Sequence, residues 1–283
     1  MNTLGIIGVG FVGTAIREGM QNHYDIETYD KYIKSTCSSI ETLLEKTNIV
    51  FICLPTPSNE NGSANIDFIE NTLLFIDNLR KENIIAVIKS TMPPGSTVRL
   101  NDKYKNVSVI FSPEFLTEKN YIDDFKNQNR IIIGGTLLAS TVVQAIFKKV
   151  FTDIPIIVTD ATTAEMVKYT ANCFLSVKVS FANEINMICD KIGIDYNKMI
   201  DYAKLDNRLG ESHWTVPGHD EHFGYGGSCF PKDIQALIFF AQELGIDADV
   251  LKGSWNNNLK VRPEKDWEQL VGRSIVDTKN KET

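Results

Sequence analysis

The chain opens with a short apolar run that leads directly into closely spaced glycines. Residues 4–7 have the character of a buried strand, and Gly8, Gly10 and Gly13 follow in the spacing GxGxxG where a helical pattern begins. A second strand-like run ends at Asp30. A strand, a glycine turn, a helix and a strand that ends in an acidic residue together predict a βαβ unit that binds a dinucleotide.

Each glycine has its own predicted task. Gly8 allows the tight turn, Gly10 lets a pyrophosphate approach the backbone, and Gly13 brings the helix against the strand. Asp30 is expected to accept a hydrogen bond from a ribose 2′-hydroxyl and to repel a 2′-phosphate, which favours NAD over NADP, although Lys31 and Lys34 soften that exclusion. A strand, turn and helix without a ligand is the alternative.

Five further apolar runs alternate with helical or polar stretches, at residues 48–54, 84–90, 107–112, 130–135 and 154–160. Nearly continuous apolar runs are typical of strands covered on both faces, so we predict an α/β fold with a doubly wound parallel sheet that ends near residue 160. Polar clusters follow three of the runs, and ligands bind at the carboxyl ends of such strands. We therefore expect one crevice to be lined by residues 55–57, 90–91 and 112–114.

Residues 162–191 contain neither proline nor glycine and predict one long helix, capped by Asp160 or Thr162 and stopped at Gly193. A helix of this length can join two domains and support a second protomer. The predicted parts are a dinucleotide-binding domain at 1–160, a helical domain at 161–255 and a charged C-terminal tail at 256–283.

Composition and charge exclude several classes of binding partner and cellular location for this chain. The net charge of −7 comes without a basic block, which argues against nucleic acid. No apolar run approaches the roughly 20 residues of a membrane helix and no signal peptide is evident, so we expect a cytoplasmic protein. Five scattered cysteines without a CxxC pair predict reduced thiols rather than disulfides or zinc. The HDEH stretch at 219–222 is expected to be a solvated loop, and no metal is predicted.

The stretch GYGGSCFPKD, residues 224–233, places Cys229 between glycines and a helix start. Pro231 is favoured in a first helical turn, so Cys229 is expected at or just before the N-terminus of a helix. The helix dipole and Lys232 would lower the pKa of its thiol, and the glycines would let a substrate come close. A small core residue is the alternative, and it is what we expect of Cys53, Cys173 and Cys189.

Glu165, Lys168 and Asn172 share one face of the predicted long helix. The lysine can supply a positive charge or move a proton, and the asparagine amide can donate to a developing oxyanion. Spacing alone favours a solvated stripe. Glu114 and Thr91 each follow a strand, where such residues are usually turn and cap formers.

Taken in order, the motifs LPTP, KSTMPPG, SPEFL, RIIIGG, VKYTAN and GYGGSCFPKD resemble those of the nucleotide-sugar 6-dehydrogenases, most closely the UDP-glucose dehydrogenase family. The resemblance covers nearly the whole chain. It implies an N-terminal Rossmann-type domain for NAD, then a long connecting helix and a smaller helical domain that forms a homodimer. It also implies the four-electron oxidation of a sugar C6 alcohol, as in polysaccharide biosynthesis, through a thioester on Cys229.

The resemblance implies further roles. Lys168 and Asn172 would stabilise oxyanions, Thr91 and Asp233 would order water, and Glu114 would assist thioester hydrolysis. The implied cofactor-binding residues are Gly8, Gly10, Phe11, Val12, Gly13, Asp30, Lys31, Pro55, Thr56, Thr91 and Glu118. The implied substrate-binding residues are Glu114, Phe115, Leu116, Lys168, Asn172, Arg208, Tyr225, Gly226 and Gly227, with Arg208 reaching a neighbouring subunit.

Longer members of the family carry a third domain that grips the nucleotide, and no such domain follows here. We expect either a naturally short form or a truncated chain. Two alternatives remain open. One is a single-step β-hydroxyacid dehydrogenase that uses Lys168 and Asn172 but no thiol, and the other is a dinucleotide-binding regulatory protein without turnover.

Overall fold

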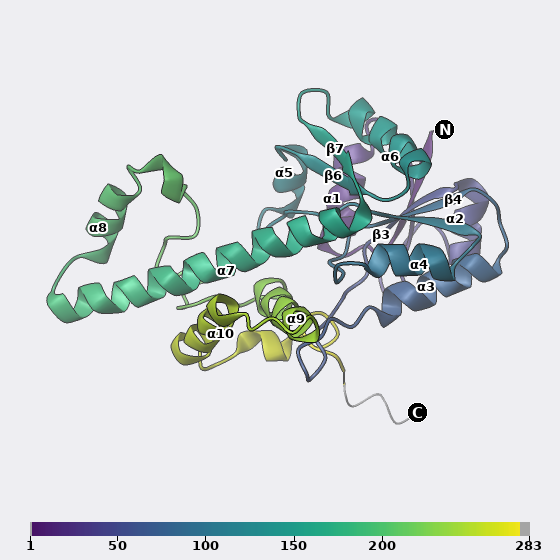
Figure 1. The fold of residues 1–283 in the computed structure, drawn as a ribbon. Coiled ribbons are helices and arrows are strands. Elements are labelled where there is room, and N and C mark those ends of the chain that lie inside the picture. Colours follow the sequence, from purple (N-terminus) through teal and green to yellow (C-terminus); the bar gives the residue numbers. More distant parts are fainter. Residues whose placement is uncertain (1, 278–283) are drawn as a thin grey trace. The chain divides into compact units, whose positions relative to one another are not determined.

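The computed structural model describes residues 2–277, drawn as the coloured ribbon of Figure 1. Two compact units emerge from its contacts. The first comprises the chain up to Thr56 together with Ile66–Lys168, and the second comprises Pro57–Asn65 together with the chain from Tyr169 onward. The division at 160 and 255 stays a prediction, and the end of the expected tail, from residue 278, lies outside the described residues.

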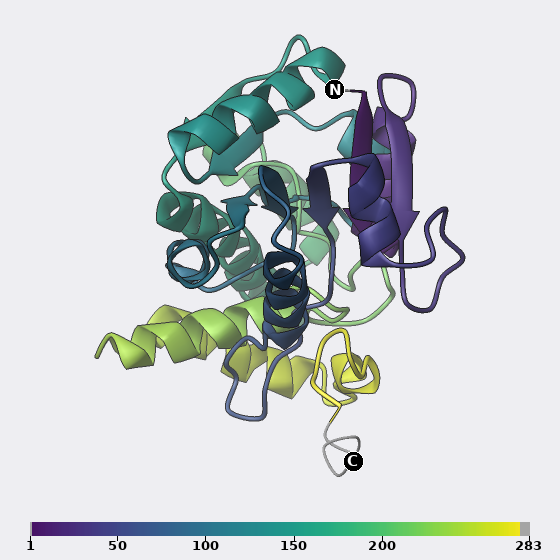
Figure 2. The same cartoon turned by 90° about the vertical axis from the view of Figure 1, so that its right-hand side faces the viewer.

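The first unit is built on a seven-stranded sheet in the order β2-β1-β3-β4-β5-β6-β7. Every run that the sequence predicts as a strand is one, which confirms the α/β class: β1 (Thr3–Ile7), β2 (Asp25–Tyr29), β3 (Ile49–Ile52), β4 (Ile84–Ile88), β5 (Val107–Phe111), β6 (Ile131–Gly134) and β7 (Ile156–Thr159). Figure 2 shows the purple strands β1 and β2 side by side at one edge.

The sheet departs from the all-parallel prediction at one junction. Strand β6 runs antiparallel to β5 and pairs with it only through Phe111 and Gly134, whereas β6 and β7 are parallel to each other. Apolar periodicity identifies strands but not their direction, so the sequence could not predict this reversal.

Two apolar layers cover the sheet. Helices α1 (Phe11–Met20), α5 (Tyr121–Lys126) and α6 (Leu137–Val150) pack on one face, around Ile6 and Phe51. The opposite face, which includes Ile7 and Ile52, is covered by α2 (Ile40–Lys46), α3 (Asp67–Asn78) and α4 (Ser96–Lys103). Neighbouring strand residues point to opposite faces and both faces are buried, which explains the continuous apolar runs.

Helix α7 (Ala161–Ile192) begins in the first unit and continues into the second, as the long teal ribbon of Figure 1. Asp160 Oδ1 accepts the backbone N–H of Thr163 at 2.8 Å, and the helix stops before Gly193, whose φ is +74°, so both predicted ends are confirmed. The remaining helices of the second unit are α8 (Tyr196–Ala203), η1 (Asn207–Leu209), α9 (Phe230–Glu243), α10 (Asp249–Val261) and η2 (Asp266–Gln269).

Buried side chains of α7 and α9 form one apolar cluster of the second unit, against which partly buried side chains of α10 pack. Helices α7 and α8 form another cluster around Trp214. Within residues 2–277, no helix combines the length and the apolar character that crossing a bilayer demands.

Candidate functional site

The glycine turn after β1 has the geometry that a dinucleotide site requires. Gly8 has a φ of +91°, and a Cβ there would lie 2.6 Å from the carbonyl oxygen of Cys53. A Cβ on Gly13 would overlap the carbonyl oxygen of Gly8, so only glycine lets α1 pack this closely on the turn. Gly10 caps α1, and a Cβ there would meet no atom within 4 Å. The space beside Gly10 therefore lets an anion approach the N-terminus of α1, where the helix dipole favours negative charge.

Asp30 connects the end of β2 to this turn. Its Oδ2 accepts the backbone N–H of Val9 at 2.7 Å, and its Oδ1 accepts those of Tyr32 and Ile33 at 2.8 and 3.0 Å. Burial alone would raise the pKa of this carboxyl, but the three backbone N–H groups outweigh that and hold the pKa below its usual value. Asp30 is thus an ionised acceptor beside the glycine turn.

The other predicted cofactor-binding residues of the first unit differ in exposure. Phe11 and Val12 form the first turn of α1, with the Phe11 ring 5.1 Å from that of Tyr121. The exposed members are Lys31, Pro55 and Glu118, and the buried ones are Thr56 and Thr91.

Two predicted catalytic residues of the first unit, Lys168 and Glu114, meet at the loop after β5. Lys168 Nζ, on α7, donates to the backbone oxygen of Glu114 at 2.5 Å and lies 3.2 Å from Glu114 Oε1. Glu114 Oε2 accepts the backbone N–H of Leu116 at 2.7 Å, and the Phe115 ring centre lies 5.3 Å from Lys168 Nζ. A buried ammonium thus sits against a carboxylate that is itself fixed by its own loop.

Lys89, which the sequence analysis did not single out, completes this cluster. It follows β4 and is only 3% exposed, and its Nζ donates to Ser112 Oγ at 3.3 Å and to the backbone oxygen of Pro113 at 3.1 Å. Burial lowers the pKa of its ammonium to about 8. The signal in the sequence was a lysine placed directly after a buried strand, at the start of KSTMPPG.

The expectation of a solvated stripe on α7 is wrong. Glu165, Lys168 and Asn172 are 0%, 2% and 7% exposed. The carboxylate of Glu165 accepts the backbone N–H groups of Gly95 and Thr97 at 2.6 and 2.8 Å, so it caps the start of α4. Spacing alone could not show that other elements cover this face of the helix.

In the second unit, the predicted residues meet at Asp233, in the first turn of α9. Asn172 Nδ2 donates to Asp233 Oδ2 at 2.6 Å, and Lys232 Nζ donates to Asp233 Oδ1 at 2.5 Å. Asp233 is 1% exposed, so these charge-assisted bonds replace the water that its carboxylate has lost.

Cys229 is the N-cap residue of α9, as predicted, and its backbone oxygen accepts the N–H of Asp233 at 3.0 Å. All five cysteines lie within the described residues, and none of them forms a disulfide. Cys173 and Cys189 are buried in apolar clusters, and burial raises the pKa of the Cys53 thiol to about 12, which fits the expected core roles.

The other predicted residues of the second unit lie on loops. Tyr225 is buried, whereas Gly226 and Gly227 are partly exposed. The exposed guanidinium of Arg208, on η1, pairs with Asp206 at 2.5 Å. In the HDEH loop, His222 Nδ1 lies 2.9 Å from Glu264 Oε1.

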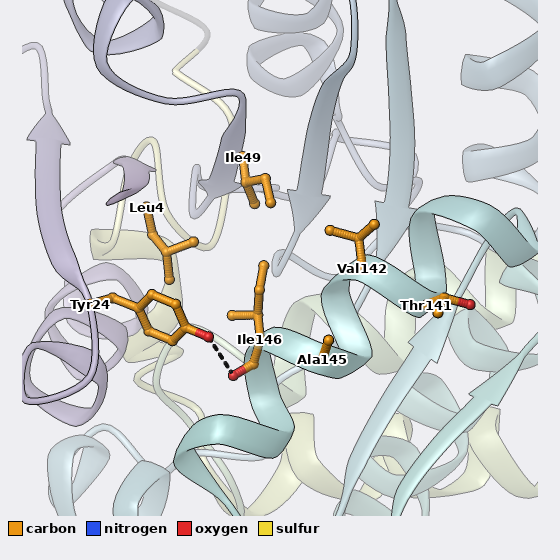
Figure 3. Close-up of a pocket in the computed structure, with 7 residues that line it drawn as sticks. All are labelled: Leu4, Tyr24, Ile49, Thr141, Val142, Ala145 and Ile146. Atoms are coloured by element: carbon orange, nitrogen blue, oxygen red, sulfur yellow. Dashed lines mark hydrogen bonds between the residues drawn. The ribbon is translucent and has the colours of Figure 1, made fainter. Parts of the chain in front are cut away.

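A cavity of about 370 Å³ in the first unit lies away from these groups (Figure 3). It lies between α6 and the starts of β1 and β3, where Leu4 and Ile49 line it, and Tyr24 closes one side by donating its hydroxyl to the backbone oxygen of Ile146 at 3.3 Å. Ligands of such sheets bind at the carboxyl ends of the strands, so this apolar cavity is not the candidate site.

Comparison with known families gives two matches that follow the chain in order. Residues 18–154 match the NAD binding domain of the UDP-glucose/GDP-mannose dehydrogenase family, and residues 162–259 match the central domain of the same family.

Individual proteins give the same picture. The UDP-glucose 6-dehydrogenase of Rickettsia bellii is 33% identical over 84% of this chain and 55% of its own length. UDP-glucose 6-dehydrogenase YwqF of Bacillus subtilis is 36% identical over 78% of this chain and 51% of its own length. The chain thus spans about half the length of these curated relatives. A UDP-glucose dehydrogenase structure from the archaeon Pyrobaculum islandicum superposes with a TM-score of 0.83 at 28% identity, covering 92% of this chain and 68% of that one.

Proposed function

Because the chain belongs to the UDP-glucose/GDP-mannose dehydrogenase family, we propose that it oxidises the C6 alcohol of a nucleotide sugar to a carboxylate, with two NAD⁺ per product. The observation that carries the proposal is the placement of Cys229 as the N-cap of α9, one helical turn before the Lys232 and Asp233 pair. UDP-glucose is the proposed substrate because the relatives above carry its name.

The first unit suits the cofactor. Bound NAD⁺ would accept a hydride, and its pyrophosphate would approach the N-terminus of α1 through the space beside Gly10. Asp30 would accept from the ribose while it keeps its bonds to the turn, since each carboxylate oxygen has two lone pairs.

Lys168 and Asn172 are proposed to stabilise negative charge on the sugar oxygen. An ammonium has three N–H donors, so Lys168 can donate to the substrate while it stays bonded to Glu114. The Asn172 amide has two N–H donors, of which one serves Asp233. Both groups are held before the substrate arrives, which is what makes such donors effective.

The proposed reaction proceeds in balanced steps. The alcohol loses its proton to a base and a hydride to the cofactor, which leaves an aldehyde. The Cys229 thiolate adds to the aldehyde carbon and gives a thiohemiacetal oxyanion. This oxyanion passes a second hydride to the second NAD⁺ and becomes a thioester. Water, which Asp233 is proposed to order, then adds to the thioester carbon, and the C–S bond breaks to release the acid and the thiol.

The test is the stoichiometry of the purified chain with UDP-glucose and NAD⁺. We expect two NADH for each molecule of UDP-glucuronate, and a melting temperature that rises with this sugar more than with GDP- or TDP-sugars. One NADH per product would contradict the proposal and favour a single-step dehydrogenase. NAD binding without NADH production for any of these sugars would favour a regulatory protein.

We also propose a homodimer through α7. The exposed apolar side chains Phe174, Phe181, Ile188 and Ile192 recur at spacings of seven and four and form a stripe on the helix. In this dimer, Arg208 is proposed to reach the substrate site of the neighbouring subunit, as the family resemblance implies. Sedimentation should show a dimer that Phe181→Asp dissociates and that Lys191→Glu, an exposed charge on the same helix, leaves intact. A wild-type monomer at micromolar concentration would contradict this.

A further inference from the structure

We define the glycine loop as residues 224–228, which lead directly into Cys229 at the start of α9. Side chains of Asn258 and Asp266, later in the chain, hold this loop in place. Asn258 is fully buried, accepts the backbone N–H of Tyr225 at 2.7 Å and donates to the backbone oxygen of Tyr225 at 2.9 Å. Two bonds to the same residue fix its peptide groups in orientation as well as in position.

Arg262 and Asp266 form the centre of this contact. Arg262 Nε donates to Asp266 Oδ1 at 2.6 Å, and its Nη2 donates to Asp220 Oδ2 at 2.8 Å. The third nitrogen, Nη1, donates to the backbone oxygen of Phe223 at 3.4 Å. One guanidinium therefore joins the segment before the glycine loop to the start of η2, a task that suits its forked geometry.

The same pair contacts the backbone just before the thiol. Asp266 Oδ2 accepts the N–H of Gly227 at 3.2 Å, and a Cβ on Gly226 would overlap Arg262 Nη2 and Asp266 Oδ1. The absence of a side chain at Gly226 is thus what lets the ion pair lie against the loop. Gly227, with a φ of +70°, then turns the chain toward Cys229.

The ion pair between Arg262 and Asp266 differs from a solvent-exposed surface pair in the burial of its guanidinium. The Arg262 side chain is 3% exposed. Burial alone would lower its pKa, but the hydrogen bonds to Asp266 and Asp220 outweigh burial and raise it. Burial alone would raise the pKa of Asp266, but the bonds from Arg262 and Gly227 hold it below its usual value. Both groups are ionised at neutral pH. Removing Asp266 leaves the buried guanidinium with Asp220 as its remaining carboxylate, and removing Arg262 leaves Asp266 without its counter-charge.

The pair is itself anchored on both sides. Arg262 directly follows α10, and its backbone N–H donates to Asn258 at 2.9 Å. Asp266 begins η2, where Trp267 is 2% exposed and its ring centre lies 5.4 Å from that of Trp255. Each member of the pair is therefore also held by its own segment of the chain.

We propose that Arg262 and Asp266 are positioning residues that hold the glycine loop in the conformation that presents Cys229. The segment after α10 then acts on the thiol through the backbone at Gly226 and Gly227. That the thiol so presented is a nucleophile rests on the proposed function, whereas the control of loop order does not.

The first test is hydrogen exchange of the intact chain, with Asp266→Asn compared with Glu268→Gln. Both substitutions remove one carboxylate from η2, but the Glu268 side chain is 56% exposed and pairs with Lys265. We expect Asp266→Asn to speed exchange in peptides from 224–230 by about fivefold or more, because a charge-assisted bond becomes a neutral one. Peptides from the middle of α7 should change less than twofold, as should all peptides of Glu268→Gln.

The second test measures access to the thiol. The rate at which iodoacetamide alkylates Cys229, located by peptide mass, should reach a plateau above the pKa of the thiol, and the plateau reports access rather than acidity. Asp266→Asn should raise the plateau rate about threefold or more. Arg262→Lys keeps the charge but carries all its donors on one nitrogen, which cannot span the three acceptors that the guanidinium reaches with three separate nitrogens. It should therefore act in the same direction, with Lys265→Arg as its control.

Unchanged exchange at 224–230 in Asp266→Asn would overturn the proposal. So would an equal rise throughout α7 and α10, because the pair would then support the whole unit rather than the loop. If Arg262→Lys does not fold, Asp266→Asn decides alone. Neither test needs turnover, so a failure of the proposed oxidation is seen separately. If the oxidation holds, Asp266→Asn should lower kcat at least tenfold and leave the KM for NAD⁺ within twofold.

Discussion

Asn172 on α7 donates its side-chain amide to the Asp233 carboxylate on α9 at 2.6 Å, and this buried bond joins residues 61 positions apart in the chain. It links the motifs VKYTAN and GYGGSCFPKD through one hydrogen bond. Lys232 donates to the other carboxylate oxygen of Asp233, and Asp233 lies in the first turn of α9, where the helix dipole favours a negative charge.

Asn172→Ala should therefore affect both stability and turnover. Losing the donor leaves a buried carboxylate underbonded, so the free energy of unfolding should fall by about 1–3 kcal/mol in urea titrations. If the amide also stabilises an oxyanion, kcat should fall by about 10²-fold or more. Asn186→Ala, at a half-buried position of the same helix, is the control. A kcat loss of about tenfold or less would leave Asn172 with a structural role alone.

Cys229→Ala separates the two proposed oxidations. The first hydride transfer needs no thiol, so the folded variant should still reduce a supplied aldehyde with NADH, while uronic acid should not accumulate. Cys229→Ser should hydrolyse any ester slowly enough for intact-protein mass measurement to detect the adduct. Acid production by Cys229→Ala near the wild-type rate, with two NADH each, would show that the thiol is only a packing residue.

Asp30→Ala should weaken NAD⁺ binding and relax discrimination against NADP⁺, because it removes a ribose acceptor and a negative charge. The three backbone bonds of Asp30 add a second effect, since the N–H of Val9 in the glycine turn loses its acceptor. Asp30→Asn keeps a hydrogen-bond acceptor at this position, so fluorescence titrations should show that it binds NAD⁺ more tightly than Asp30→Ala does. If Asp30→Ala keeps the wild-type preference for NAD⁺ over NADP⁺, Asp30 is not the residue that selects the cofactor.

The lowered pKa of Lys89 predicts that the unfolding free energy rises with pH. Its pKa in the folded state is about 8, below the usual value near 10.4 for an unfolded lysine, so the unfolded state binds more protons between these values. The stability contribution is fully present above about pH 10.4 and is lost as the pH falls through 8. The unfolding free energy of the wild type minus that of Lys89→Met should rise by about 1–3 kcal/mol from pH 8 to 10. If this difference in unfolding free energy does not change between pH 8 and 10, Lys89 does not have the lowered pKa.

Glu165 should be essential for stability rather than for chemistry. Its carboxylate caps α4 through Gly95 and Thr97, and it is completely buried. Glu165→Ala should lower the unfolding free energy by about 2–4 kcal/mol, because several donors are left unpaired. Glu184→Ala, on the exposed side of α7, should change it by less than about 0.5 kcal/mol. A stability loss at Glu165 no larger than at Glu184 would show that the cap is dispensable.

The sequence by itself determined the elements and the motif geometry. The seven strands, the long helix between Asp160 and Gly193, and Cys229 at the start of α9 all follow from apolar runs, caps and glycines, which act over a few residues. Local rules suffice there because periodicity and backbone conformation are properties of neighbouring residues.

Only the tertiary structure decided which polar groups are buried and what they bond. The burial of Glu165, the lowered pKa of Lys89, the reversed strand β6 and the contact of Arg262 and Asp266 with the glycine loop depend on residues far apart in the chain. Their partners carry no spacing signal, since any distant element can supply a carboxylate or a backbone oxygen. Desolvation, which fixes the state of each charge, exists only once those elements have packed together.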